Sequence, residues 1–132
     1  MRRIGLLIGA WLALAAPAFA ENCPDQSQQG LNACANAAYK KADDALNGVY
    51  REIARRLRND AATAKLLVAA QKAWIGFRDA ECAFAVSENA GGSIYPMVYA
   101  ECLERLTKAR TSALRGYLKC GDGDLGCPVP SD

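Results

Sequence analysis

Histidine is absent from the 132 residues of this sequence. Its absence excludes Ser-His and Cys-His catalytic pairs, His-ligated zinc or haem, and an imidazole that titrates near neutral pH. The cysteines include no Cys-x-x-Cys pair, so a zinc site without histidine is not expected either. The sequence also contains no internal repeat and no low-complexity tract, and its length fits a single domain.

An apolar run near the N-terminus is too short to span a bilayer comfortably. Arg2 and Arg3 precede this run, which covers residues 4–16; Pro17 ends it, and Ala-Phe-Ala then places small residues at −3 and −1 of a cleavage site. We therefore predict that residues 1–20 form a removable export signal. The remaining chain is expected to be periplasmic or secreted.

The small excess of positive charge belongs to this predicted signal. The whole chain has sixteen Lys and Arg against fourteen Asp and Glu. Removing Arg2 and Arg3 leaves fourteen of each, so the chain from Glu21 onward is neutral. Neutrality gives no support to nucleic-acid binding or to steering onto an anionic membrane. Cys23 would be the third residue after cleavage instead of the first, so no stable membrane anchor is expected.

The cysteines indicate three disulfides. All of them follow the predicted signal, and an even number of cysteines in an oxidising compartment is typical of a disulfide framework. They are Cys23, Cys34, Cys82, Cys102, Cys120 and Cys127.

Apolar residues recur at alternating intervals of three and four in three segments, which is the period of an amphipathic helix. The pattern predicts helices over residues 27–59, 61–88 and 93–120. Three such helices joined by short connections pack most simply as an antiparallel bundle. The expected fold class is therefore all-α, a disulfide-braced antiparallel three-helix bundle.

Turn-forming residues mark the boundaries of this bundle. Gly91 and Gly92 end the second helix, and Ser93 is the expected N-cap of the third. We expect the helical domain to occupy residues 21–120. Glycine, proline and aspartate in residues 121–132 predict an irregular tail.

The bundle restricts the cysteine pairing. Cys82 and Cys102 lie at similar distances from the connection between the second and third helices, and Cys34 falls in the same layer of the first helix. Cys23 can reach that layer from the N-terminal segment. These four are therefore predicted to pair among themselves, with the choice of partners open, while the last two cysteines close a local loop in the tail.

Four blocks of the sequence resemble those of a known family. The blocks are Leu46-Asn47-x-x-Tyr50, Ala70-Gln71-x-Ala73-Trp74-x-x-Phe77-Arg78-Asp79-x-x-Cys82, Gly92-Ser93, and Cys102-x-x-x-Leu106-Thr107-x-x-Arg110-x-x-x-Leu114. Over residues 23–118 the chain resembles the LprI-like lysozyme-inhibitor family of bacterial envelope proteins. The resemblance implies a small secreted or lipid-anchored helical domain, and some relatives inhibit lysozyme. The chain departs from the family in lacking a cysteine placed for a lipid anchor and in its additional Cys120 and Cys127 pair.

Five residues of these blocks are expected to serve the structure: Asn47, Tyr50, Trp74, Arg78 and Arg110. Trp74 lies in the middle of an apolar stripe and is expected in the core. Arg78, one turn later, can cover that ring or pair with a carboxylate. We expect a bridge between Arg110 and Asp44, which lie at matching depths in parallel helices. Asn47 is expected to bond a neighbouring helix or terminus.

Two surface features are candidates for binding. Arg51, Arg55 and Arg58 form a basic stripe on one helix face, which we interpret as a solvated face partly neutralised by Glu52. The connection between the second and third helices is the stronger candidate for partner binding. Its residues Gly92, Ser93, Ile94 and Tyr95 combine a turn, a hydroxyl, a β-branched side chain and an aromatic ring.

The favoured function is that of an exported lysozyme-inhibitor-like protein that occludes the cleft of a peptidoglycan-cleaving enzyme. The alternative is a non-inhibitory envelope module that binds another exported protein or a wall polymer. An enzyme is not expected, since the adjacent Asp43 and Asp44 point about 100° apart on a helix and cannot form a glycosidase pair. No cofactor and no metal are expected. Overall neutrality argues against strong steering onto a cationic lysozyme, and the sequence leaves the oligomeric state open.

Overall fold

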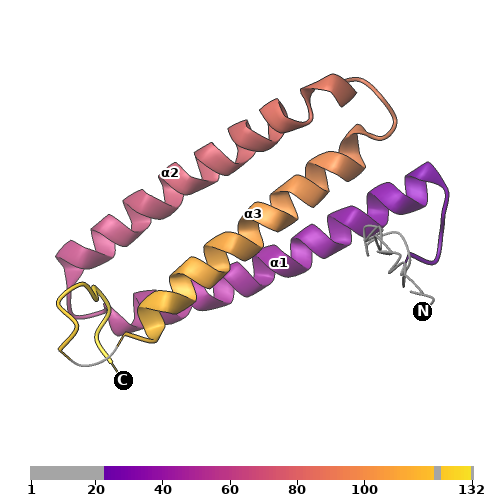
Figure 1. Cartoon of the computed structure of the whole chain (residues 1–132). Helices are drawn as coiled ribbons and strands as arrows, with labels where there is room; N and C mark the ends of the chain where they lie inside the picture. Colours follow the sequence, from indigo (N-terminus) through magenta and orange to yellow (C-terminus); the bar gives the residue numbers. More distant parts are fainter. Residues whose placement is uncertain (1–22, 121–122, 132) are drawn as a thin grey trace, which may run out of the picture.

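Residues 23–120 and 123–131 are described by a computed structural model, and three α-helices dominate it (Figure 1). They are α1 (Gln28–Arg56), α2 (Ala61–Ala85) and α3 (Tyr95–Leu118), and a 3-10 turn, η2 (Ser87–Asn89), follows α2. These described residues contain no strand. The prediction of an all-α antiparallel three-helix bundle is confirmed. The predicted export signal lies outside the described residues.

Side-chain caps begin the first two helices. Ser27 Oγ accepts a hydrogen bond from the Gly30 N–H at 3.1 Å, and Asp60 Oδ1 accepts one from the Thr63 N–H at 3.0 Å. Each bond satisfies a backbone donor that has no partner within the helix. The bond from Thr63 also lowers the pKa of the Asp60 carboxyl.

The predicted N-cap of the third helix is wrong. α3 begins at Tyr95, its N-cap residue is Ile94, and no side chain caps it. The Tyr95 N–H donates to the Gly92 carbonyl at 3.1 Å, so Ser93 lies inside a turn, one residue before the cap position. Pro96 has no N–H and therefore removes one unsatisfied donor from the first turn of α3. All three helices end two or three residues before their predicted ends.

α1 and α3 lie side by side and run parallel, and α2 runs antiparallel and approaches this pair chiefly along α3 (Figure 1). The buried side chains of α2 are accordingly few, namely Gln71, Arg78 and Cys82. Much of the surface of α2 is therefore in contact with solvent.

The apolar core lies toward the end of the bundle where α1 and α3 terminate. Leu46 and Ile53 from α1 and Leu57, which directly follows this helix, meet Leu114 from α3, and each is at most 2% exposed. Full burial of such a side chain contributes about 2 kcal/mol to stability. Val129 of the tail joins the same cluster.

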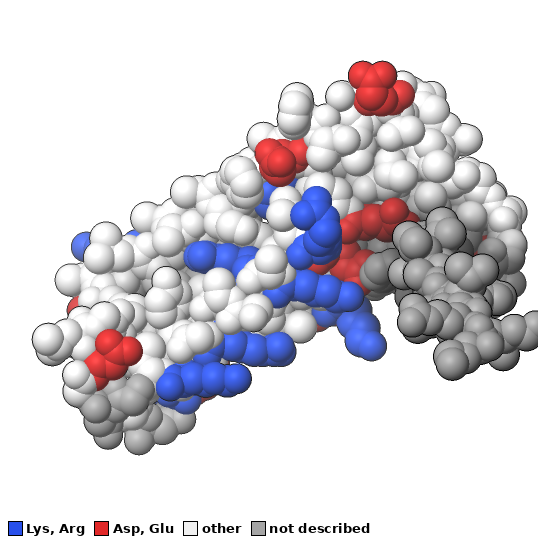
Figure 2. Space-filling view, viewed as in Figure 1, with Lys and Arg blue, Asp and Glu red and all other residues white. Residues whose placement is uncertain are grey.

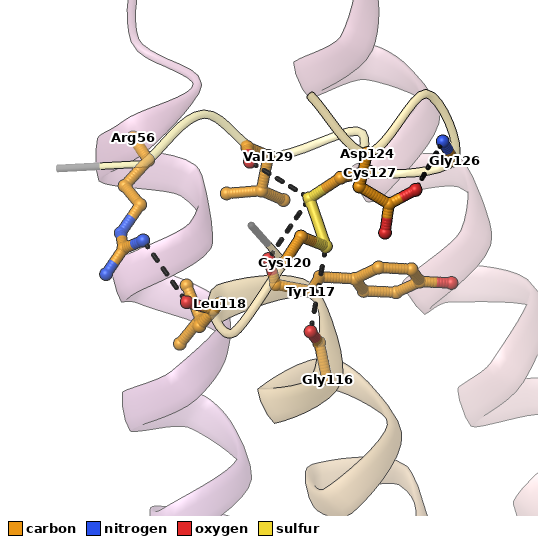
Figure 3. The surroundings of a disulfide bond; sticks show 9 residues. All are labelled: Arg56, Gly116, Tyr117, Leu118, Cys120, Asp124, Gly126, Cys127 and Val129. Atoms are coloured by element: carbon orange, nitrogen blue, oxygen red, sulfur yellow. Dashed lines mark hydrogen bonds between the residues drawn. A yellow bond between two sulfur atoms is a disulfide. The ribbon is translucent and has the colours of Figure 1, made fainter. Parts of the chain in front are cut away.

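The tail is irregular, as expected, but it also completes the core. The disulfide between Cys120 and Cys127, with Cα atoms 5.7 Å apart, brings the chain back toward the end of α3. Figure 3 shows Val129 beyond this disulfide, near the end of the bundle, where its side chain is 5% exposed. The burial of Val129 was not predicted from the sequence.

The other two disulfides lie at the opposite end of the bundle. Cys23 pairs with Cys34, and Cys82 pairs with Cys102, with Cα separations of 6.0 and 5.6 Å. The first ties the N-terminal segment to α1, and the second joins α2 to α3 below their connection. The structure thus decides the pairing that spacing alone left open.

Candidate functional site

The connection between α2 and α3 forms an exposed tip at the end of the bundle, which we define as residues 91–95. Gly91 has φ of +78°, a conformation that favours glycine, and a Cβ on Gly92 would lie 3.2 Å from the Asn89 carbonyl oxygen. The glycines therefore serve the turn itself. Ser93 is exposed, and Ile94 is 37% exposed.

The tip is held from three sides. The Tyr95 ring stacks on the Tyr99 ring, with centroids 5.6 Å apart and planes 11° apart. Asn32 Nδ2, on α1, donates a hydrogen bond to the Ser93 carbonyl at 3.1 Å. The fully buried Cys82 fixes α2 to α3 just below the tip. This bracing suits a surface that binds without rearrangement.

Charge is separated along the bundle. Residues 23–39 and 79–104, which surround the tip, contain six carboxylates and no Lys or Arg. All fourteen Lys and Arg of the described chain lie in residues 40–78 and 105–119. Figure 2 shows blue side chains across the middle and left of the molecule and most of the red ones toward the right, the end that carries the tip in Figure 1.

Ion pairs neutralise two carboxylates at the boundary between the acidic region and the basic region. Asp79 pairs with Arg78 at 2.8 Å, and Glu104 pairs with Lys108, both across the boundary. Among the described ion pairs, none includes Glu81 or Glu88, which lie nearer the tip. Partial burial, and to a smaller extent the Glu104 carboxylate, raise the pKa of Glu101. The tip therefore lies in a region of negative potential.

Arg78 is only 7% exposed and lies at the centre of a cluster, the Arg78 cluster, formed with Tyr39, Asp43, Trp74 and Asp79. Its guanidinium lies 5.2 Å from the Trp74 ring centroid and 5.5 Å from that of Tyr39. It also lies 3.6 Å from the Asp43 carboxylate of α1. Arg78 thus covers the ring of Trp74 and pairs with carboxylates at the same time.

The expected bridge between Asp44 and Arg110 is absent from the described residues, and that prediction is wrong. Arg110 Nε instead donates to Gln71 Oε1 at 3.1 Å, and its guanidinium lies 5.9 Å from the Trp74 ring centroid. Asp44 is exposed because the neighbouring Asp43 takes the inward-facing position on α1. Two guanidinium groups therefore lie within 6 Å of the Trp74 ring centroid.

The prediction for Asn47 is also wrong. Its side-chain amide donates to Asp43 Oδ2 at 3.0 Å, one turn earlier on the same helix, and not to a neighbouring helix or terminus. This bond helps to orient the carboxylate that faces Arg78. Tyr50, from the same block, packs against the apolar core.

Comparison with known proteins now identifies the group to which this bundle belongs. The family model described as lysozyme inhibitor LprI matches residues 20–114. The chain belongs to the LprI lysozyme-inhibitor family. The match includes both disulfides at the tip end and the whole Arg78 cluster, whereas Cys120, Cys127 and Val129 lie beyond it.

A curated relative of similar length matches nearly the whole chain. An uncharacterized protein of Rhizobium meliloti (strain 1021) is 37% identical over 138 aligned positions, which cover 92% of this chain and 99% of the relative. No solved structure matches the chain significantly. Family membership and three disulfides both indicate an exported LprI protein.

The basic stripe of this LprI protein is partly neutralised within α1. Glu52 pairs with Arg55 at 2.7 Å and with Arg56 at 2.9 Å. Hydrogen bonds from these two guanidinium groups lower the pKa of Glu52 to about 2. Arg51 and Arg58 remain exposed on either side of this group.

Neither a metal centre nor a membrane span was found in the part of the chain that the structure describes. No group of three or more potential ligand residues could hold a metal ion within residues 23–120 and 123–131. None of the helices there has an apolar stretch long enough to cross a bilayer. The charge separation was not predicted, although the distribution of Lys and Arg along the sequence could have revealed it.

Proposed function

We propose that this LprI protein inhibits a lysozyme by placing the tip, residues 91–95, in the substrate cleft and blocking it sterically. No bond is made or broken in this mechanism. Family membership supports the class of target, and the observation that carries the proposal is the acidic, cation-free surrounding of the braced tip.

The charge arrangement supports a cationic lysozyme as partner. The tip itself bears no charged side chain, so it can enter a cleft lined by catalytic carboxylates without like-charge repulsion. Glu81 and Glu88, further back, can then face a basic rim. Overall neutrality argued against such steering, but association depends on the local potential at the approaching end and not on the net charge.

A turbidity assay of lysozyme on bacterial cell walls tests the proposal. The oxidised protein should slow lysis in a dose-dependent manner for at least one lysozyme class. Ser93→Arg should weaken inhibition at least tenfold, because it adds bulk at the tip that must fit the cleft, while the Ser93 contact to Asn32 uses only the backbone carbonyl. Ser112→Arg, an exposed change on α3 in the basic region, is the matched control and should inhibit normally.

Two results would contradict different parts of the proposal. Unchanged inhibition by Ser93→Arg and by Ile94→Asp would exclude the tip as the binding surface. Failure of the unmodified protein to inhibit any lysozyme class at large excess would instead exclude the inhibitor function.

The alternative is a non-inhibitory module that binds an anionic wall polymer through its basic region. The exposure of Arg51 and Arg58 favours this alternative. Co-sedimentation with purified peptidoglycan sacculi tests it, since Arg51→Glu combined with Arg58→Glu should abolish binding if these residues make the contact. An exported inhibitor and an exported wall-binding module would both act in the periplasm or outside the cell.

A further inference from the structure

The outward surface of α2 carries an apolar stripe in contact with solvent. Leu66, Phe77 and Phe84 are 70%, 57% and 77% exposed. At about 100° of rotation per residue, they lie within about 20° of one another around the helix axis. A contiguous apolar stripe of this kind is typical of an interaction surface, since its burial would release favourable free energy.

Small residues complete this surface. Four exposed alanines adjoin the stripe: Ala62, Ala69, Ala73 and Ala80. We call the three large residues and these four alanines the α2 face. Ala73, at its centre, points about 140° away from the buried Arg78, so the α2 face is turned away from the bundle.

We propose that the α2 face binds the α2 face of a second copy of this chain, with the two helices antiparallel and a two-fold axis passing beside Ala73. In this arrangement, residues at equal distances on opposite sides of position 73 lie at the same level in the two copies. The resulting levels combine Leu66 with Ala80, Phe77 with Ala69, and Phe84 with Ala62.

Size complementarity supports this register. Every large side chain of the α2 face shares its level with an alanine of the other copy, so no large side chain opposes another large one across the interface. The two alanines at position 73 meet near the axis and allow the backbones to approach closely. A two-fold pair needs only one self-complementary surface, and the α2 face has this property.

One oppositely charged pair at an edge of the α2 face fits the same register, although Lys72, on the same edge, approaches its own copy near the axis. Lys65 and Asp79 lie on the same edge of the α2 face, eight residues before and six residues after Ala73. Antiparallel pairing brings Lys65 of one copy to within about 3 Å along the axis of the level of Asp79 in the other. Asp79 is paired with Arg78 but its side chain remains 48% exposed, so it can accept a second cation.

The area of the α2 face suits a weak dimer that forms reversibly. A phenylalanine side chain presents roughly 200 Å² when fully exposed, so the three large residues of two copies bring together on the order of 800 Å². The alanines and the edge residues add to this area, and specific interfaces begin at about 1,200 Å² in total. The dimer would leave the two tips free at opposite ends, so this inference does not depend on lysozyme inhibition.

Sedimentation velocity of the full chain, exported and recovered with its disulfides formed, measures the oligomeric state. We expect a dimer at high concentration that dissociates on dilution. Ala73→Glu should give a monomer, since it places two carboxylates beside the axis. Val68→Glu, a change at an exposed residue about 140° from Ala73 around α2, is the control and should remain dimeric. Far-UV circular dichroism confirms that each variant is folded.

Cysteine cross-linking tests the register. Ala73→Cys should form a disulfide-linked dimer, and Ala80→Cys should not, because its two copies lie about 21 Å apart along the axis. A mixture of Leu66→Cys and Ala80→Cys should form the mixed dimer. A monomeric unmodified protein, a dimer that survives Ala73→Glu, or self-cross-linking of Ala80→Cys would each overturn the proposal.

Discussion

Arg78 connects α2 to α1 through contacts that only a planar cation can make together. It covers the rings of Trp74 and Tyr39 and pairs with the Asp43 and Asp79 carboxylates while nearly buried. Lysine carries the charge but has no planar fork, so it cannot stack and pair at once. The residue therefore belongs to the framework of the bundle and not to the binding surface.

Replacement of Arg78 by alanine should lower the free energy of unfolding by about 2–3 kcal/mol, because it removes packing over two rings and the cation beside Asp43. Urea denaturation followed by circular dichroism measures the change. Arg78→Lys should recover part of the loss, and Arg51→Ala, an exposed change on α1, should alter stability by less than about 0.5 kcal/mol. A loss no larger for Arg78→Ala than for Arg51→Ala would exclude the framework role.

Glu52 gives a pH-dependent contribution to stability. Its pKa is lowered to about 2 in the folded protein by hydrogen bonds from Arg55 and Arg56. A lowered pKa in the folded state means that the ionised form stabilises the fold above the pKa of the unfolded chain, about 4.3, and that this contribution is lost as pH falls through the folded value. Glu52→Gln should therefore unfold more easily than the unmodified protein at pH 7.

The stability difference between these two proteins should shrink as pH is lowered from about 4.3 toward 2. Thermal unfolding at a series of pH values gives the comparison. A difference that stays constant over this range would show that the carboxylate charge of Glu52 is not responsible.

At the scale of the elements, the bundle is held unevenly. α1 and α3 share the apolar core, whereas α2 depends on the Arg78 cluster, a few apolar side chains and the Cys82–Cys102 disulfide. This explains why α2 can present an apolar face to solvent without disturbing the core. The same disulfide lies directly below the tip.

Replacing Cys82 and Cys102 by serine should cost about 3 kcal/mol, because their disulfide closes a loop of roughly 20 residues in the unfolded chain. The variant should also lose inhibitory potency, since α2 and α3 would no longer be fixed below the tip. The control is the pair Cys120 and Cys127, whose replacement should lower stability through the tail while leaving potency unchanged. Equal losses of potency in both variants would contradict a specific role for the disulfide near the tip.

At the scale of the whole molecule, the chain has a net charge of only +2 but behaves as an elongated dipole. The acidic region around the tip and the basic remainder are separated along the bundle (Figure 2). A cationic partner approaching the tip therefore meets a negative potential in spite of the small positive net charge.

The association rate with a cationic lysozyme should fall about tenfold when ionic strength rises from about 50 to about 300 mM, because salt screens this potential. Surface plasmon resonance measures the rate. Glu81→Gln combined with Glu88→Gln should flatten the salt dependence, whereas Asp44→Asn, in the basic region, should leave it unchanged. A rate independent of salt would exclude electrostatic steering.

The sequence by itself determined the helices, the bundle and the family. Apolar residues at intervals of three and four specify three helices regardless of their neighbours, and the glycines at 91 and 92 specify the turn between α2 and α3. Sequence also placed Trp74 beside Arg78, because residues one turn apart share a helix face. Helix ends were less accurate, since capping depends on the local turn that a residue joins.

Only the tertiary structure decided which residues meet across the bundle. Asp43 faces Arg78, whereas the next residue of α1, Asp44, is exposed to solvent. The periodicity of apolar residues does not resolve a difference of one position on the helix. The burial of Val129 depends on a tail that folds back through a disulfide, and tail residues have no periodic pattern. The packing of the helices also gathers residues 23–39 and 79–104 around the tip, although each segment is visibly free of Lys and Arg in the sequence. The residues of the α2 face share one helix, and only their exposure to solvent was decided by the tertiary structure.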